Sequence, residues 1–104
     1  MSRKEKLEQM LVCQPEDPFL HYALAMEWVK EGNAESGLRL FDRVLALDAG
    51  YLGAYMQKAN TLIGQDRFLD ARATLKAGID AANQKGDTHA ADEMRGLLES
   101  VPND

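Results

Sequence analysis

The residue types most often used in catalysis and metal binding are few in this chain and lie far apart. Its two histidines are His21 and His89, and its single cysteine is Cys13. A zinc site needs several Cys, His or carboxylate ligands at close spacing, and these residues are not arranged in that way. We expect His89 to be solvated near a helix start. We expect Cys13 to be a small buried thiol, and no metal or cofactor.

The segment of residues 32–39, GNAESGLR, has the glycine spacing of a phosphate-binding loop. It lacks the Lys-Ser/Thr pair that would contact phosphate, and no strand is predicted before it. The 17 Asp and Glu residues are spread along the sequence, and no pair stands out as an acid/base dyad. The sequence therefore predicts a protein that is not an enzyme.

The composition is that of one ordinary globular domain. The chain has 104 residues, of which 45% are hydrophobic and 28% charged, with a formal net charge of -5. This charge argues against a nucleic-acid surface, which needs clustered basic residues. The cluster Arg3, Lys4 and Lys6 is interleaved with Glu5 and Glu8, which is typical of a solvated helix face.

A single cysteine cannot form an internal disulfide, which favours a reducing compartment. The N-terminal residues contain no apolar run typical of a secretory signal. The most apolar stretch, residues 19–29, includes Glu27 and is much shorter than the roughly 20 residues that a membrane span needs. We therefore expect a cytoplasmic protein with no membrane partner.

Helical periodicity of apolar residues runs through the whole sequence, with no sustained strand-like alternation. Asp17 is a plausible N-cap, the pair Gly32-Asn33 favours a helix end, and Asp87 or Thr88 could cap the last helix. Short connections predict antiparallel neighbours, and hence an all-α chain of helical hairpins. The six predicted helices span roughly residues 2–13, 18–31, 34–48, 51–64, 68–84 and 88–100.

The hairpins repeat with a period of 34 residues. In this register Gly37 coincides with Ala71, and Ala25 coincides with Ala59. A glycine inside a helix costs about 1 kcal/mol relative to alanine. Small residues at paired points allow two helix backbones to approach closely, which offsets that cost. We predict that Gly37 lies where the helices of residues 18–31 and 34–48 cross.

With this period the sequence resembles the tetratricopeptide repeat (TPR) family, whose signature is W-x2-L-G-x2-Y followed by A-x3-F and a proline. The resemblance covers roughly residues 5 to 84, and Lys58 departs from it where the family prefers leucine. The matching residues are His21, Leu24, Ala25, Trp28, Gly37 and Phe41 in the first copy, and Tyr55, Lys58, Ala59, Leu62, Ala71 and Leu75 in the second. The family position that His21 matches packs between helices, so the resemblance implies that His21 is a core or half-buried side chain.

The resemblance implies a short right-handed solenoid in a single domain, residues 1–104. Within it, residues 1–14 are a half-repeat helix, 18–51 the first repeat, 52–85 the second, and 87–101 a capping helix. Two full repeats alone would be marginally stable, so the flanking helices supply the remaining contact surface.

The helix of residues 18–31 is apolar all round, which indicates either complete burial or a second binding face. In the family, the first helix of each hairpin lines a concave groove, with residues such as Leu24 and Trp28 on its core face. Methionine and aromatic side chains are common at adaptable partner surfaces. The resemblance places eight residues on the groove side: Phe19, Tyr22, Met26, Val29, Met56, Gln57, Asn60 and Ile63.

Two functions follow from this pattern. The first is a non-enzymatic module that binds a peptide or helix of a partner protein in the apolar groove, with Asn60 fixing its orientation. The alternative is a self-associating module that forms a homodimer through the same patch. Tyr22 and Met26 occupy the places of a Lys and an Asn that clamp a terminal carboxylate in some family members, so such a clamp is not expected. Core packing of Tyr22 and Met26 remains open as a third interpretation.

Overall fold

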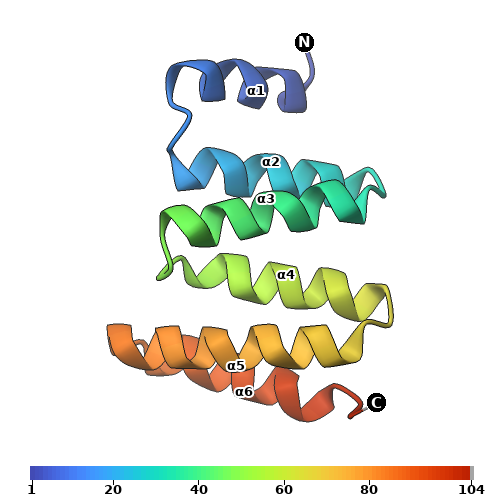
Figure 1. Ribbon diagram of the computed structural model, residues 1–104, viewed down its shortest axis with the longest axis vertical. Coiled ribbons are helices and arrows are strands. Elements are labelled where there is room, and N and C mark those ends of the chain that lie inside the picture. The colour runs from blue at the N-terminus through green and yellow to red at the C-terminus, as the bar shows by residue number, and fades with distance from the viewer. Residues whose placement is uncertain (104) are drawn as a thin grey trace. The chain divides into compact units, whose positions relative to one another are not determined.

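The computed structural model describes residues 1–103, and over this range the chain forms six α-helices and no strand (Figure 1). The predicted all-α fold class is confirmed, and every predicted helix end lies within one residue of the observed one. The helices are α1 (Arg3–Cys13), α2 (Pro18–Lys30), α3 (Ala34–Leu47), α4 (Leu52–Gly64), α5 (Phe68–Lys85) and α6 (Thr88–Ser100).

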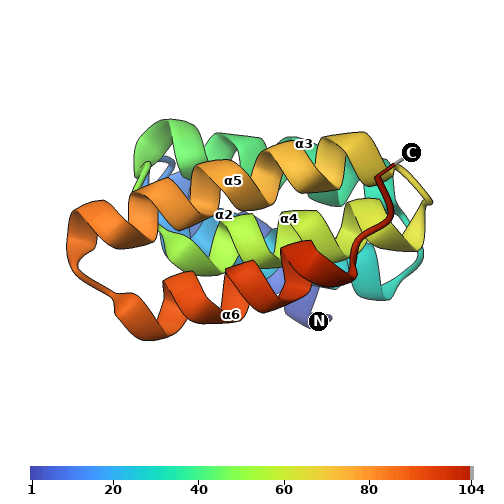
Figure 2. The same cartoon turned by 90° about the horizontal axis from the view of Figure 1, so that it is seen from below.

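The helices form two compact units, one of residues 1–51 and one that begins at Leu52. The first unit contains α1, α2 and α3, and the second contains α4, α5 and α6. Consecutive helices within each unit run in opposite directions, as Figures 1 and 2 show. The predicted division into a half-repeat helix, two repeats and a capping helix stays a prediction. The assignment of the whole chain to one domain stays a prediction.

Side-chain caps fix most helix starts. Asp17 accepts a hydrogen bond from the Phe19 backbone N–H (2.9 Å), and Pro18 occupies the first turn of α2. The chain leaves α2 through Gly32, whose φ of 88° is a left-handed conformation that favours glycine. Asn33 then caps α3, and Asp87 caps α6. The caps predicted at Asp17 and Asp87 and the helix end predicted at Gly32-Asn33 are confirmed, whereas the capping of α3 by Asn33 was not predicted.

In the first unit, α2 packs on α1 with one face and on α3 with another. The contact with α3 is closest at Gly37. A Cβ atom at that position would overlap Val29 Cγ2 and would lie 3.2 Å from the carbonyl oxygen of Ala25. The predicted close crossing at Gly37 is therefore confirmed. Phe41, one turn further along α3, is completely buried.

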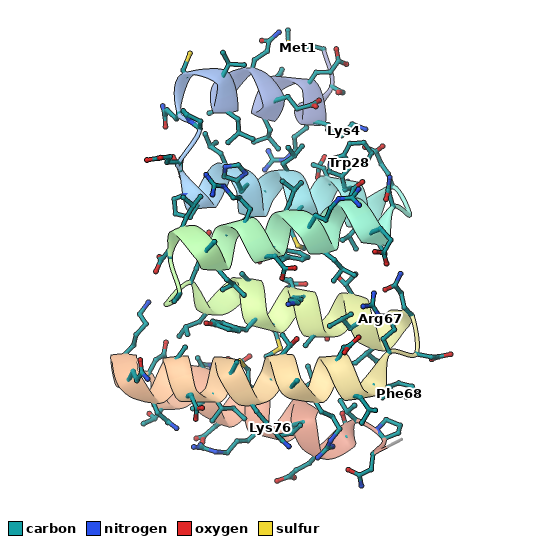
Figure 3. All side chains as sticks on the ribbon, viewed as in Figure 1. Met1, Lys4, Trp28, Arg67, Phe68 and Lys76 are labelled. Carbon is teal, nitrogen blue, oxygen red and sulfur yellow. The ribbon has the colours of Figure 1, made fainter. Side chains whose placement is uncertain are left out.

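The contact between α1 and α2 is partly polar. Leu7 is buried against Leu20 and Leu24, whereas Trp28 is only partly buried at the edge of this cluster. The Lys4 ammonium group lies 3.8 Å from the centroid of the Trp28 ring and 3.0 Å from a carboxylate oxygen of Glu31 (Figure 3). Trp28, which the sequence placed on the core face, thus packs against the apolar cluster and is covered in part by a cation.

Cys13 is exposed, so the prediction of a buried thiol was wrong. The helix α1 has a single buried residue, Leu7, and presents Met10 and Val12 to solvent at 48% and 82% exposure. Only one narrow stripe of α1 contacts α2, and Cys13 lies outside that stripe. The apolar character of these residues therefore did not indicate burial.

In the second unit, α5 packs against both α4 and α6. The guanidinium group of Arg72 on α5 donates hydrogen bonds to the carbonyl oxygens of Leu98 (3.2 Å) and Val101 (3.0 Å). These bonds fix the end of α6, whose last carbonyl groups have no partner within the helix. Val101 is also buried, so the chain beyond α6 folds back onto the unit.

Candidate functional site

The α2 residues predicted for the groove differ in how far they are exposed. Phe19 is 55% exposed, and Tyr22, Met26 and Val29 are half-buried. The ring of Tyr22 lies with its centroid 5.1 Å from that of Tyr51 and 6.0 Å from that of Phe41. Tyr22 therefore takes part in an aromatic cluster of the first unit, and Phe19 is the residue of this set that is open to a partner.

Val29 contributes to the interior of the first unit. Its Cγ2 atom occupies the space that a side chain at Gly37 would need. At least this methyl group packs in the crossing of α2 and α3, although the sequence placed Val29 on the groove side. Branched side chains fill the gap that a glycine leaves, and this contact fixes the spacing of the two helices.

Tyr51 lies in an acidic and partly buried environment. Burial raises the pKa of its phenol above the ordinary value of 10.0, and Tyr22, Asp17 and Asp48 raise it further. The backbone N–H of Tyr51 also donates to the carbonyl oxygen of Asp48 (3.1 Å). The phenol thus stays protonated and neutral across the physiological pH range.

The α4 residues Met56 and Gln57 line a cleft in the second unit. The cleft has a volume of about 240 Å³ and opens between α4 and α6. Asn60 is exposed and Ile63 is half-buried, and both lie further along α4, outside the cleft lining. The structure therefore places two of the four predicted α4 residues together in a cavity. The full lining consists of Leu52, Gly53, Met56, Gln57, Ala90, Glu93 and Met94.

The floor of the cleft depends on a close contact at Gly78 of α5. A Cβ atom at Gly78 would lie 2.5 Å from the sulfur of Met94 and 2.8 Å from the Cβ atom of Tyr55. Because Gly78 has no side chain, α4 and α6 both approach α5 at this point. Met94 is only 1% exposed and yet borders the cleft, so it forms part of the floor.

The α6 contribution to the cleft was not predicted from the sequence. Ala90, Glu93 and Met94 line the cleft from α6, which lies in the segment of residues 87–101 that the sequence predicts only to be a capping helix. The starts of α2 and α4 are 34 positions apart, whereas those of α4 and α6 are 36 apart. The long helix α5 accounts for this shift, and the shift hid the correspondence of α6 to the first helix of a repeat.

The histidines have structural partners. His21 is half-buried, as predicted, and its Nε2 atom lies 2.7 Å from the carbonyl oxygen of Pro15, so Nε2–H donates this bond. Its Nδ1 atom is buried without a hydrogen-bond partner among residues 1–103. His89 is exposed, as predicted, and its Nε2 atom lies 2.7 Å from a carboxylate oxygen of Glu93. Both side chains thus have contacts that suit packing and helix stabilisation.

Residues 1–103 show neither a cluster of metal-binding side chains nor a helix suited to a membrane. Within residues 1–103, no group of three or more His, Cys, Asp and Glu side chains is arranged to hold a metal ion. None of the helices in this range combines the length and the apolar character that a membrane crossing needs. The expected lack of a cofactor stays a prediction.

Comparisons with known proteins agree on one family. A family model described as tetratricopeptide repeat matches residues 29–98. The solution structure of a TPR domain protein from Salinibacter ruber is 35% identical, with a TM-score of 0.78 over 83% of this chain and 87% of that one. A protein from Bordetella parapertussis is 25% identical, with a TM-score of 0.82 over 96% of this chain and 87% of that one.

A third structure shows the same fold at lower identity. It is the TPR2B domain of yeast Sti1 in a complex with pHsp70, which is 20% identical, with a TM-score of 0.85 over 92% of this chain and 77% of that one. Among curated proteins, none matches the chain significantly. Proteins of this repeat family are in general protein-interaction modules and not enzymes. On its sequence match and its helical repeats, the chain belongs to the tetratricopeptide repeat family.

Proposed function

We propose that this protein binds a peptide segment of a partner protein and that the cleft between α4 and α6 holds one of its side chains. The observation that carries the proposal is the placement of Met56 and Gln57, together with Met94, around one cavity. Its volume of about 240 Å³ is smaller than the roughly 300–1,000 Å³ of small-molecule sites. A cavity of this size suits an apolar side chain of a peptide.

The lining supports adaptable recognition. Met56 is half-buried at the cleft, and the unbranched thioether of methionine adjusts to side chains of different shape. The Gln57 amide both donates and accepts hydrogen bonds, so it can bind the backbone of a peptide. We also propose partner contacts for the other six predicted residues, which are Phe19, Tyr22, Met26, Val29, Asn60 and Ile63.

A selected peptide and a matched pair of methionine variants test the proposal. Peptides are selected on the wild-type protein from a displayed library, and their dissociation constants are measured by fluorescence polarisation. Met56→Ala should weaken binding roughly tenfold, as truncation of a residue that carries much of the binding energy does. Met10→Ala, the same change at a partly exposed position outside the cleft lining, should leave binding unchanged. Equal affinity of the wild type and Met56→Ala for every selected peptide would rule out the cleft as the site.

Self-association is the second candidate, and the exposure of Phe19 favours it. A phenylalanine that is 55% exposed is an apolar surface that a second copy could cover. Light scattering coupled to size exclusion measures the mass of the wild type and of Phe19→Ser. A dimer that Phe19→Ser converts to a monomer would support this candidate. A monomeric wild type at high concentration would exclude it.

We also propose a reducing compartment such as the cytoplasm. The exposed thiol of Cys13 supports this location, because an exposed free cysteine is readily oxidised elsewhere. A fluorescent fusion expressed in the source cells would show where the protein resides.

A further inference from the structure

The charges around the α4–α6 cleft are unevenly distributed. Leu52, Ala90 and Met94 give it an apolar surface, and Gln57 adds a neutral amide. Glu93 is the one charged residue in the lining. A segment that enters the cleft therefore meets an apolar floor with a carboxylate beside it.

The negative charge of Glu93 is available to a partner. Its side chain is 55% exposed, and the His89 imidazole, whose Nε2 atom lies 2.7 Å from its carboxylate, is itself 87% exposed on the same helix. The guanidinium group of Arg95, the one lysine or arginine of α6, lies 3.1 Å from a carboxylate oxygen of Asp92. An incoming ammonium or guanidinium group can therefore pair with Glu93 without displacing a buried ion pair.

When a bound segment covers the cleft, its affinity depends on the sign of the charge that it places beside Glu93. A bound segment removes water from Glu93, which costs free energy unless a cation replaces the lost solvation. An acidic residue beside Glu93 adds repulsion to that cost. We infer that the cleft selects segments in which a lysine or arginine adjoins an apolar residue, and that it discriminates against acidic segments. This inference rests on the proposed function of the same cleft.

Three synthetic peptides test the inference. Each has eight residues with Leu-Leu-X-Leu at the centre, is acetylated and amidated, and differs only at X, which is Lys, Gln or Glu. Fluorescence polarisation at about 50 mM salt limits screening of the charges. The Lys peptide should bind roughly two- to fivefold more tightly than the Gln peptide, in line with an exposed ion pair, and the Glu peptide should bind least tightly.

Charge variants of α6 distinguish an effect of the Glu93 carboxylate on peptide binding from an effect of the protein's net charge. Glu93→Lys should reverse the order of the three peptides, and Glu93→Gln should remove the difference between the Lys and Gln peptides. Glu99→Lys makes the same charge change at an exposed position of α6 outside the cleft lining, so it should preserve the order. His89→Ala keeps the carboxylate and should also preserve it.

The results of these binding measurements distinguish a failure of the charge selectivity from a failure of the cleft as the binding site. Equal binding of all three peptides to the wild type, or reversal by Glu99→Lys as complete as that by Glu93→Lys, would overturn the charge selectivity. If Met56→Ala still weakens all three peptides in that case, the cleft remains the binding site. If no peptide binds, or if Met56→Ala changes no affinity, both the inference and the proposed function are wrong for segments of this kind.

Discussion

Met94 and Gly78 are in contact at the point where α6 meets α5, with the Met94 sulfur 2.5 Å from where a Gly78 Cβ atom would lie. The Cβ atom of Tyr55, on α4, is nearly as close to the same point, at 2.8 Å. One missing side chain therefore determines how closely three helices approach one another. The shape of the cleft depends on this contact.

The first prediction concerns that contact. Gly78→Ala should destabilise the protein by about 1–3 kcal/mol, because Tyr55 and Met94 must both move, although alanine is the better helix former. Gly96→Ala is the matched control, since a Cβ atom at Gly96 meets nothing within 4 Å. That variant should be up to about 1 kcal/mol more stable than the wild type. Urea unfolding measures both, and a Gly78→Ala variant as stable as Gly96→Ala would contradict the close packing.

The crossing of α2 and α3 gives the second prediction. Gly37→Leu should cost about 1–3 kcal/mol, because the added side chain collides with Val29 and with the backbone at Ala25. Gly96→Leu adds the same side chain to an open helix position and should not destabilise the fold. Thermal unfolding of the two variants provides the comparison. An unchanged melting temperature for Gly37→Leu would show that the crossing can open without cost.

The third prediction concerns the attachment of α1 to α2. Lys4→Gln removes both the contact with the Trp28 ring and the ion pair with Glu31, and should cost about 0.5–1 kcal/mol at low salt. The control is Arg3→Gln, because Arg3 is 64% exposed and its guanidinium lies 3.8 Å from the Glu27 carboxylate. That change should have little effect. Trp28 is the only tryptophan, so its fluorescence reports unfolding directly. Equal costs for the two variants would argue against a specific role of Lys4.

The fourth prediction is a loss of stability at high pH through Tyr51. The folded protein raises the pKa of this phenol above 10.0, chiefly by burial. As pH rises, tyrosine in the unfolded chain ionises first, so the unfolded state is favoured. The contribution of Tyr51 is complete below pH 10 and is lost as pH rises through the raised pKa. Above pH 10, the free energy of unfolding should fall more steeply for the wild type than for Tyr51→Phe. Parallel curves for the two proteins would refute this.

The sequence predicted the helices and the Gly37 crossing because both depend on local periodicity. Apolar spacing, caps such as Asp17, and the 34-residue match of Gly37 to Ala71 are all visible in one chain. Gly78 gave no such signal, since the residue one period earlier is Val44, which is large and completely buried. A close contact that occurs in only one repeat cannot be found from the repeat pattern.

The parts of the site that the sequence did not predict depend on tertiary packing. The role of Glu93 and Met94 requires α6 to lie beside α4, which depends on the length of α5 and on the contact at Gly78. The exposure of Cys13 and the partial burial of Trp28 depend on which stripe of α1 meets α2. Residue type alone did not contain this information.

Methyl NMR of the methionines shows directly whether a peptide binds in the α4–α6 cleft. The chain has five methionines, and two of them, Met56 and Met94, line the cleft. When the Leu-Leu-Lys-Leu peptide is titrated into protein with labelled methionine methyl groups, the signals of these two residues should shift together with one dissociation constant. Met1 and Met10, on the exposed N-terminal part, should not shift. A bound peptide that leaves Met56 and Met94 unchanged and shifts Met1 or Met10 would contradict the claim.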